Sequence, residues 1–221
     1  MWGQDGPREG ETRGRAVMEI PSFSTSSAAP ATGRLLVATP ELIDPNFRDS
    51  VVLLLDHNAE GTLGVILNRP TPILVASVLS GWSAAAEPPE VLFEGGPVDK
   101  DSALALAEVR ESGGALGPLD AAATDPIGFR RLFGDVGIID LDTPSEVLGP
   151  ALHRLRVFAG YAGWSPGQLE NEIEQDSWYV VDGVPEDVFV AHPARLRADV
   201  LRRQPGELAW VATRPEDAAL N

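Results

Sequence analysis

A proline that follows a serine constrains this chain more than any other residue. Residues 163–167 read Gly-Trp-Ser-Pro-Gly and match the G-x-S-x-G pattern of a nucleophile elbow, between an apolar run and a helix-like run. Such an elbow uses the backbone N–H of the residue after the serine in its oxyanion hole, and Pro166 has no N–H. We therefore expect no catalytic residue here, and a hydrolase that uses Ser165 is a disfavoured alternative.

The same motif predicts the beginning of a helix. Ser165 is typical of an N-cap, Pro166 of the first helical position, and Gln168 of the third position in a capping box. In this interpretation the serine oxygen accepts hydrogen bonds from backbone N–H groups at the helix start. The hydroxyl would then belong to the scaffold and would not attack a substrate.

The chain is strongly acidic, which limits its partners. It has 221 residues with 33 acidic and 17 basic side chains, and its formal net charge is −16. This charge repels phosphate backbones and anionic membranes, so we expect no membrane binding and no direct nucleic-acid binding. A local arginine pocket could still bind a small anion.

Other classes of protein are excluded by what the sequence lacks. It has no cysteine, which removes disulfides, thiol catalysis and thiolate metal ligands. No apolar run reaches the roughly 18–20 residues of a membrane-spanning helix. The first residues lack the apolar core of a signal peptide, so we expect a cytoplasmic protein.

The beginning of the chain differs in composition from the rest. Residues 1–32 are rich in Gly, Ser, Thr, Ala, Pro and charged side chains without periodicity, and we expect a disordered N-terminal tail. Either Met1 or Met18 could be the true start. Residues 33–221 show no internal repeat and no dividing linker, so we expect one domain.

Short apolar runs alternate with turns and helical patterns in this domain. The predicted strands are residues 35–37, 51–55, 62–68, 91–93, 103–109, 136–141, 155–159 and 178–181, of which 103–109 could also be a helix. The predicted helices are residues 73–79, a segment with Thr143 as N-cap and Pro144 at its first position, the segment after Ser165, and residues 194–203. Residues 111–128 are interpreted as a loop, and residues 208–212 as a last strand or a helical turn. Strands occur both in a hairpin and between helices, which favours an α+β fold with a mixed sheet.

Two positions at the ends of predicted strands could face a cleft. His57 follows a buried run and could contact a ligand, or it could hydrogen-bond the hairpin turn that follows. Asn68 and Arg69 follow the next strand, and an arginine can bind a carboxylate or a phosphate with two hydrogen bonds. The alternative for Arg69 is an ion pair with Glu94 or Glu172.

No constellation typical of a metal or cofactor site is present. The three histidines show no H-E-x-x-H spacing, and the glycines around Trp164 match neither G-x-G-x-x-G nor a P-loop. Glu172 shares a helix face with Gln168, but no second carboxylate can be placed opposite it for general acid–base catalysis. We therefore expect no metal and no cofactor.

Several motifs, taken in order along the chain, resemble one protein family. They are Gly33-Arg-Leu-Leu-Val-Ala-Thr-Pro, Asp44, Phe47, Ser50-Val-Val, His57, Gly61, Gly64, Asn68-Arg69-Pro70, Phe93-Glu94-Gly95-Gly96-Pro97-Val98, Gly160-Tyr-Ala-Gly-Trp, Gly167-Gln-Leu-Glu-Asn-Glu and Trp178. Over residues 33–203 the chain is similar to the AlgH/YqgE family. The resemblance implies a single α+β domain whose mixed, branching sheet is partly rolled into a barrel and flanked by helices. It implies no established reaction.

Binding is the function that these observations favour over catalysis. Members of this family are sometimes labelled as transcriptional regulators. The chain shows no helix-turn-helix pattern and no basic face, so a DNA-associated regulator is a second disfavoured alternative. We expect a non-catalytic binding or regulatory module whose partner is a small anionic ligand or another protein. The candidate cleft is lined by His57, Asn68, Arg69, Glu94, Gly95, Gly96, Trp164, Gln168 and Glu172.

Overall fold

The computed structural model describes residues 28–110, 125–206 and 208–211. Its strands are β1 (Arg34–Ala38), β2 (Val51–Asn58), β3 (Gly61–Ile66), β4 (Pro70–Leu74), β5 (Val91–Glu94), β6 (Val98–Val109), β7 (Phe129–Phe133), β8 (Val136–Ile139), β9 (Leu152–Trp164) and β10 (Trp178–Asp182). Its helices are α1 (Val75–Val78), η1 (Ser80–Ala85), α2 (Ser145–Leu148), η2 (Gly149–Ala151), α3 (Gln168–Glu174), α4 (Pro185–Val188), η3 (Pro193–Arg195), α5 (Leu196–Arg202) and α6 (Leu208–Val211). Most of the expected tail, both candidate start residues and most of the expected loop at 111–128 lie outside the described residues.

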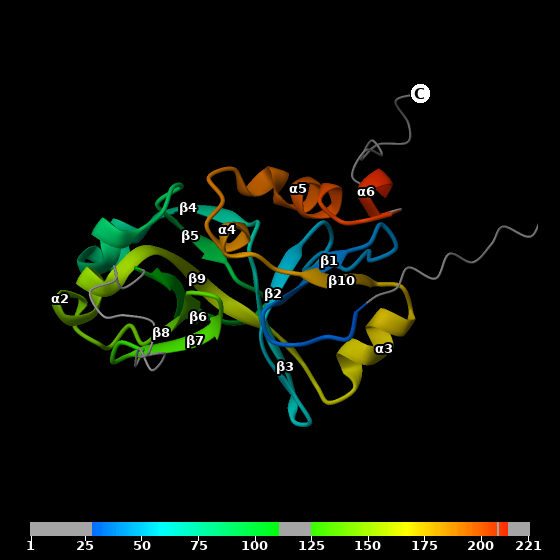
Figure 1. Ribbon diagram of the computed structural model, residues 1–221, viewed down its shortest axis with the longest axis horizontal. Coiled ribbons are helices and arrows are strands. Elements are labelled where there is room, and N and C mark those ends of the chain that lie inside the picture. Colours follow the sequence, from blue (N-terminus) through cyan, green and yellow to red (C-terminus); the bar gives the residue numbers. More distant parts are fainter. Residues whose placement is uncertain (1–27, 111–124, 207, 212–221) are drawn as a thin grey trace, which may run out of the picture.

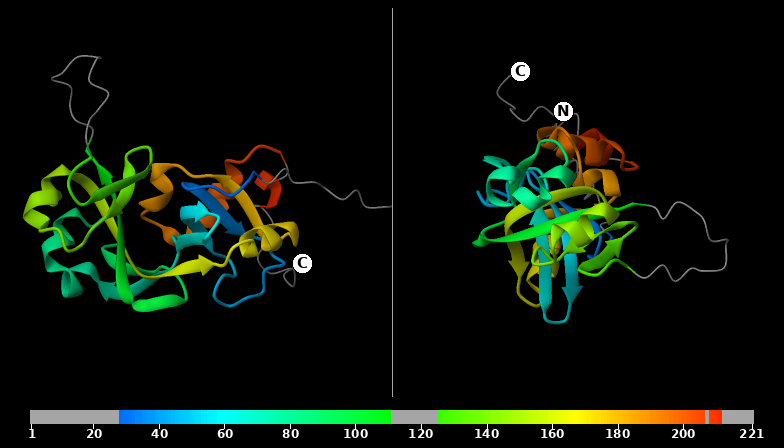
Figure 2. Two further views of the ribbon diagram at one scale, coloured as in Figure 1. Left: turned by 90° about the horizontal axis from the view of Figure 1, so that it is seen from below. Right: turned by 90° about the vertical axis from the view of Figure 1, so that its left-hand side faces the viewer.

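One ten-stranded sheet, centred on β9, organises the domain. Its main path runs β10-β1-β2-β3-β9-β6-β8-β7, and β4 and β5 branch from it where β5 pairs with β9. The strand pairs are antiparallel apart from β5 with β9, which is parallel. The sheet curls into a half-barrel with short helices along its flanks (Figure 1), and β9 connects its two parts (Figure 2). The predicted α+β domain with a mixed, branching and partly rolled sheet is confirmed.

The apolar run at the start of β2 explains why both faces of the sheet carry a core. Val51, Leu53 and Leu55 belong to one apolar cluster, and Val52 and Leu54 belong to another. Side chains of α4 and α5 pack into the first cluster, and a leucine of α3 packs into the second. A third cluster includes side chains of η1 and α2 at the other end of the domain. This strand is buried on both faces, as predicted.

Several predicted elements differ from the structure for physical reasons. Residues 103–109 belong to strand β6 and do not form a helix, whereas residues 208–211 form the helical turn α6. The helix expected at 73–79 covers only α1, because Ile73 and Leu74 continue β4, whose only sheet partner among the described strands is β5. An edge position of this kind tolerates prolines in a strand. β7 has no counterpart among the predicted strands, since two exposed arginines interrupt its apolar residues.

The cap predicted for α2 is wrong. The helix begins at Ser145, and Pro144 is its N-cap with an extended ψ of 129°. No side-chain cap bond forms at this end, so Thr143 does not play the expected role. Because the backbone of Pro144 is extended, the proline precedes the helix and does not occupy its first turn.

The cap predicted for α3 forms only in part. The helix begins at Gln168, and its N-cap is Gly167 with a left-handed φ of 75°. The Gln168 side-chain oxygen accepts a hydrogen bond from the Ser165 N–H at 3.0 Å, which is one half of the expected capping box. The Ser165 hydroxyl is exposed and is not the cap, because the turn at Pro166 places it too early in the chain.

Candidate functional site

The structure divides the nine candidate residues between two places. Asn68 accepts a hydrogen bond from the N–H of Val51, where β2 begins, whereas His57 lies near the far end of the same strand. Six residues of extended chain separate those points by about 20 Å. One group consists of His57, Trp164, Gln168 and Glu172 around α3, and the other of Asn68, Arg69, Glu94, Gly95 and Gly96.

Glu172 forms the centre of the first group. Its carboxylate accepts hydrogen bonds from the indole N–H groups of Trp164 and Trp178, at 2.9 and 2.8 Å, and from the Gln168 amide at 2.9 Å. Phe47 stacks on Trp164 with ring centroids 5.6 Å apart. This carboxylate therefore satisfies two indoles that are almost completely buried, which is a structural role.

His57 joins the β2–β3 hairpin to α3. Its Nδ1 lies 2.8 Å from the Thr62 hydroxyl, and its Nε2 lies 3.5 Å from the Glu170 carboxylate. When the neutral ring carries its proton on Nε2, facing the carboxylate, Nδ1 accepts a hydrogen bond from the Thr62 hydroxyl. The structural alternative expected for His57 was a hydrogen bond to the hairpin turn. The observed partners are instead Thr62, just after that turn, and Glu170 on α3.

Ser165 lacks the partners of an activated nucleophile. Its hydroxyl is exposed, and across the described residues no hydrogen bond joins it to a histidine or a carboxylate. A serine nucleophile needs an adjacent base and an oxyanion hole. Pro166 removes the usual donor to that hole, so the geometry gives the hydrolase alternative no support.

The glycines of the second group allow two backbones to approach closely. The Gly95 N–H donates to the Ala159 carbonyl at 2.8 Å, and the Gly95 carbonyl accepts from the Ile66 N–H at 2.8 Å. A Cβ atom on Gly96, whose φ is 157°, would lie 2.2 Å from the carbonyl of Tyr161. These glycines therefore pack the turn after β5 against β9, and they leave no space there for a ligand atom.

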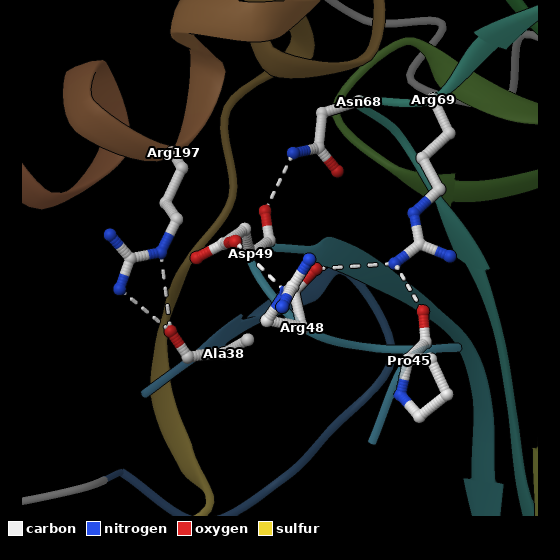
Figure 3. Close-up of polar contacts among 7 residues, drawn as sticks. All are labelled: Ala38, Pro45, Arg48, Asp49, Asn68, Arg69 and Arg197. Carbon is white, nitrogen blue, oxygen red and sulfur yellow. Dashed lines mark hydrogen bonds and ion pairs between the residues drawn. The ribbon is translucent and has the colours of Figure 1, made fainter. Parts of the chain in front are cut away.

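Asn68 holds a strained turn at the beginning of β2. Its side-chain oxygen accepts the Val51 N–H at 3.0 Å. Its amide donates to the Asp49 carbonyl at 2.8 Å, as Figure 3 shows. Asp49 has a φ of 59°, in the left-handed region that is uncommon for a residue with a side chain. Asn68 thereby stabilises the conformation of the segment that precedes β2.

Three arginines lie in or near this segment, and we call Arg48, Arg69 and Arg197 the arginine cluster. Arg69 donates to the carbonyls of Arg48 and Pro45, at 3.2 and 3.4 Å. Arg197, from α5, donates twice to the Ala38 carbonyl at 2.9 and 3.3 Å. Figure 3 shows these side chains around the turn, with Arg48 between the other two.

The arginine cluster is poorly neutralised. Arg48 lies 3.6 Å from Asp49, in an ion pair whose two side chains are both exposed. Neither Arg69 nor Arg197 has an ion pair with a described residue, because Glu94 pairs with Lys100 at 2.6 Å instead. The ion pair of Arg69 with Glu94 or Glu172, which the sequence left open, does not form.

Only one member of the cluster was predicted as a candidate site residue. Arg69 follows a predicted strand, but Arg48 lies in a turn, and Arg197 comes from a helix far along the chain. Ser50, in the same segment, has a fully enclosed hydroxyl without a partner, although its backbone carbonyl accepts the Ala38 N–H at 3.0 Å. Nothing in the local sequence indicates that these residues meet.

Arg156 is a further charged residue that the sequence analysis missed. It is 2% exposed, lies over the Phe93 ring at 4.4 Å, and donates to the carbonyls of Val190 and Pro88 at 3.0 and 2.7 Å. Burial lowers the pKa of Arg156 to about 10, which leaves the guanidinium charged at neutral pH. Because Arg156 is enclosed and donates to backbone carbonyls of two loops, its role is structural.

The described part of the chain shows neither a cluster of metal ligands nor a membrane-spanning helix. No three His, Cys, Asp or Glu side chains gather as metal ligands within residues 28–110, 125–206 and 208–211. In those ranges no helix has the length and apolar character to cross a membrane.

Comparison with known proteins gives the family. A family model described as AlgH-like matches residues 35–209. The chain belongs to the AlgH-like family. A UPF0301 protein from Streptomyces coelicolor is 56% identical over 190 residues, which are 86% of this chain and 95% of that protein. A UPF0301 protein from Mycobacteroides abscessus is 41% identical over 218 residues, which are 98% of each.

Solved structures support the same assignment. A crystal structure of a protein from Corynebacterium diphtheriae has a TM-score of 0.76 and 32% identity, and the match covers 85% of this chain and 94% of that one. The solution structure of AlgH from Pseudomonas aeruginosa has a TM-score of 0.58 and 26% identity, with 86% and 98% covered. The predicted resemblance to the AlgH/YqgE family is confirmed.

Proposed function

We propose that this AlgH-like protein is a non-catalytic binding or regulatory module that binds a small anion at the arginine cluster. The observation that carries the proposal is that Arg69 and Arg197 bond to backbone carbonyls and have no carboxylate partner among the described residues. In a chain with 33 acidic and 17 basic side chains, two arginines without an ion pair in one place are unexpected.

Each guanidinium keeps N–H groups for a ligand. An arginine has five N–H donors, and Arg69 uses only Nη2, whereas Arg197 uses Nε and Nη2. The carbonyl bonds fix both side chains in place, which lowers the entropy that binding would cost. A carboxylate or a phosphate can accept hydrogen bonds from the remaining N–H groups. Among the described residues, the carboxylate with which such a ligand competes for the arginine cluster is that of the exposed Asp49.

The rest of the molecule supports a small ligand over a macromolecular anion. The net charge of −16 opposes a long phosphate backbone, although it leaves a local interaction of three arginines intact. The small phosphorylated and carboxylated anions that would fit are abundant inside cells, in agreement with the cytoplasmic location that we predict.

A thermal-shift experiment tests the proposal. Phosphate, pyrophosphate, citrate and ATP would be compared with sodium chloride at equal ionic strength. A ligand present at about 100 times its Kd stabilises the folded state by about 2.7 kcal/mol, which raises the Tm by several degrees. We expect at least one of these anions to do so, and we expect Arg69→Gln and Arg197→Gln to abolish the shift relative to their own baselines.

The matched control is Arg202→Gln on α5. Arg202 is exposed and pairs with Asp199, away from the Ala38 carbonyl that Arg197 binds, so this variant should keep the full shift. The proposal is wrong if no anion raises the Tm of the unmodified protein, or if Arg69→Gln and Arg202→Gln respond alike.

A further inference from the structure

A cavity of about 430 Å³ lies at the other end of the domain, between η1 and the segment that leads through α2 and η2 into β9. It lies in the part of the molecule that contains α2, whereas the arginine cluster lies with β1, β2 and α5 (Figure 1). None of the nine residues expected to line a cleft contributes to it. Its volume is within the range of small-molecule sites, about 300–1,000 Å³.

We propose that this cavity binds a small zwitterion with an apolar body, such as an apolar amino acid. Three kinds of lining side chain carry the proposal: the cation Arg110, the carboxylate of Glu146, and an apolar wall that includes Trp82 and Leu152. A ligand with a carboxylate, an ammonium group and an apolar side chain complements all three. His153 is the remaining titratable group on the lining, and it is exposed.

Arg110 is held in place with N–H groups to spare. Its Nε donates to the Leu152 carbonyl at 2.9 Å, and its backbone N–H donates to the Ala151 carbonyl at 2.9 Å. No ion pair links it to any residue of the described chain, so both terminal nitrogens are available to a carboxylate. This arrangement allows a bidentate contact with a ligand.

Trp82 lines the cavity and is only 5% exposed. Its indole N–H has no hydrogen bond to a described residue. It is also not among the fully enclosed polar atoms that lack a partner in the described chain, which belong to Ser50 and Arg156, so it is accessible. We infer that a ligand in the cavity reaches this donor, which would otherwise require water.

Gly149 lines the cavity and has free space beside it. A Cβ built on Gly149 meets no atom within 4 Å, and the residue has ordinary helical angles, with φ −52° and ψ −42°. The position therefore accepts a larger side chain without backbone strain, and we expect a leucine there to occupy part of the cavity. Gly149→Leu is consequently a variant that fills the site, and Gly149→Ala is its matched control.

Titration with L-phenylalanine, observed by NMR, tests the proposal. The readout is the indole N–H signal of Trp82, assigned by its loss in Trp82→Phe. We expect a saturable shift of this signal with a Kd below about 1 mM, and no comparable shift of the Trp164 and Trp178 signals. Phenylalaninamide lacks the carboxylate and N-acetylphenylalanine lacks the ammonium group, so each should bind at least about tenfold more weakly.

The variants separate this site from general effects. Arg110→Gln and Glu146→Gln should each raise the Kd about tenfold, Gly149→Leu should abolish binding, and Gly149→Ala should retain most of it. Dispersed Trp164 and Trp178 signals show that each variant is folded. The proposal is overturned if phenylalanine leaves the Trp82 signal unmoved, if Gly149→Leu binds as Gly149→Ala does, or if the amide binds as well as the amino acid.

Discussion

Glu172 shows at the residue scale how one carboxylate can stabilise a core. Three side chains donate to it, and two of them are the indoles of Trp164 and Trp178, which are 5% and 2% exposed. An enclosed N–H without a partner costs about 1–3 kcal/mol. The acidic residue therefore contributes stability because it satisfies donors that apolar side chains surround.

Glu172→Ala should lower the free energy of unfolding by about 2–4 kcal/mol, because two indole donors lose their acceptor. Glu172→Gln should cost less, since its amide oxygen can still accept from the indoles. Urea unfolding followed by tryptophan fluorescence measures both. Glu174→Ala, an exposed position of the same helix, should stay within about 0.5 kcal/mol of the unmodified protein, and a similar loss in both alanine variants would contradict this assignment.

At the scale of elements, the ends of the β2–β3 hairpin are held by different contacts. His57 connects one end to α3, and Asn68 connects the other to the turn at Asp49. Strand pairing alone leaves such ends free to fray, because their last backbone groups lack partners. The side chains of His57 and Asn68 therefore each hold one end of the hairpin against a neighbouring element.

Asn68→Ala should destabilise the protein by about 1–3 kcal/mol, because the Val51 N–H and the Asp49 carbonyl both lose a partner. Hydrogen exchange should also become faster at Val51. The control is Asn58→Ala at the exposed tip of the hairpin, which should have a smaller effect on thermal unfolding. Unchanged exchange at Val51 in Asn68→Ala would show that the turn does not depend on this side chain.

At the scale of the whole molecule, Arg156 joins parts of the chain that are distant in sequence. Its guanidinium lies on Phe93 and bonds to the loops at Pro88 and Val190, so β5, β9 and the segment after α4 meet at one buried charge. The folded pKa of about 10 lies below that of a free arginine. Above about pH 10 the unfolded state therefore binds more protons than the folded state, and stability rises with pH there. Below about pH 9 both states are charged, and the group contributes no pH dependence.

Arg156→Lys should be destabilising at pH 7 by about 2–4 kcal/mol, because an ammonium group cannot reach both carbonyls while its charge stays buried. Burial lowers the pKa of a lysine into an accessible range, so its folded form releases a proton more readily than its unfolded form. The loss relative to the unmodified protein should hence shrink as the pH rises from about 7 to about 9. Urea unfolding at both values measures it, and a constant or growing loss would contradict the prediction.

The sequence predicted those features that depend on neighbours in the chain. The buried run in β2, the hairpin after it and the helix at 194–203 follow from apolar periodicity and turn residues, and the structure contains all of them. We predicted Ser165 as the N-cap of α3, which places the start of the helix too early. The N-cap is Gly167, because its left-handed backbone forms the turn that precedes the helix.

The candidate site depended on contacts that no local pattern contains. Arg197 bonds to the end of β1 because α5 folds back onto that strand, whereas Arg69 bonds to the turn before β2. The cavity beside Gly149 exists because η1 packs against α2. The sequence by itself determined the family, the type of fold and the absence of cysteine chemistry, and Pro166 in the sequence disfavours a serine nucleophile at Ser165. Only the tertiary structure decided which charged side chains meet, because their positions are fixed by the packing of elements that lie far apart in the chain.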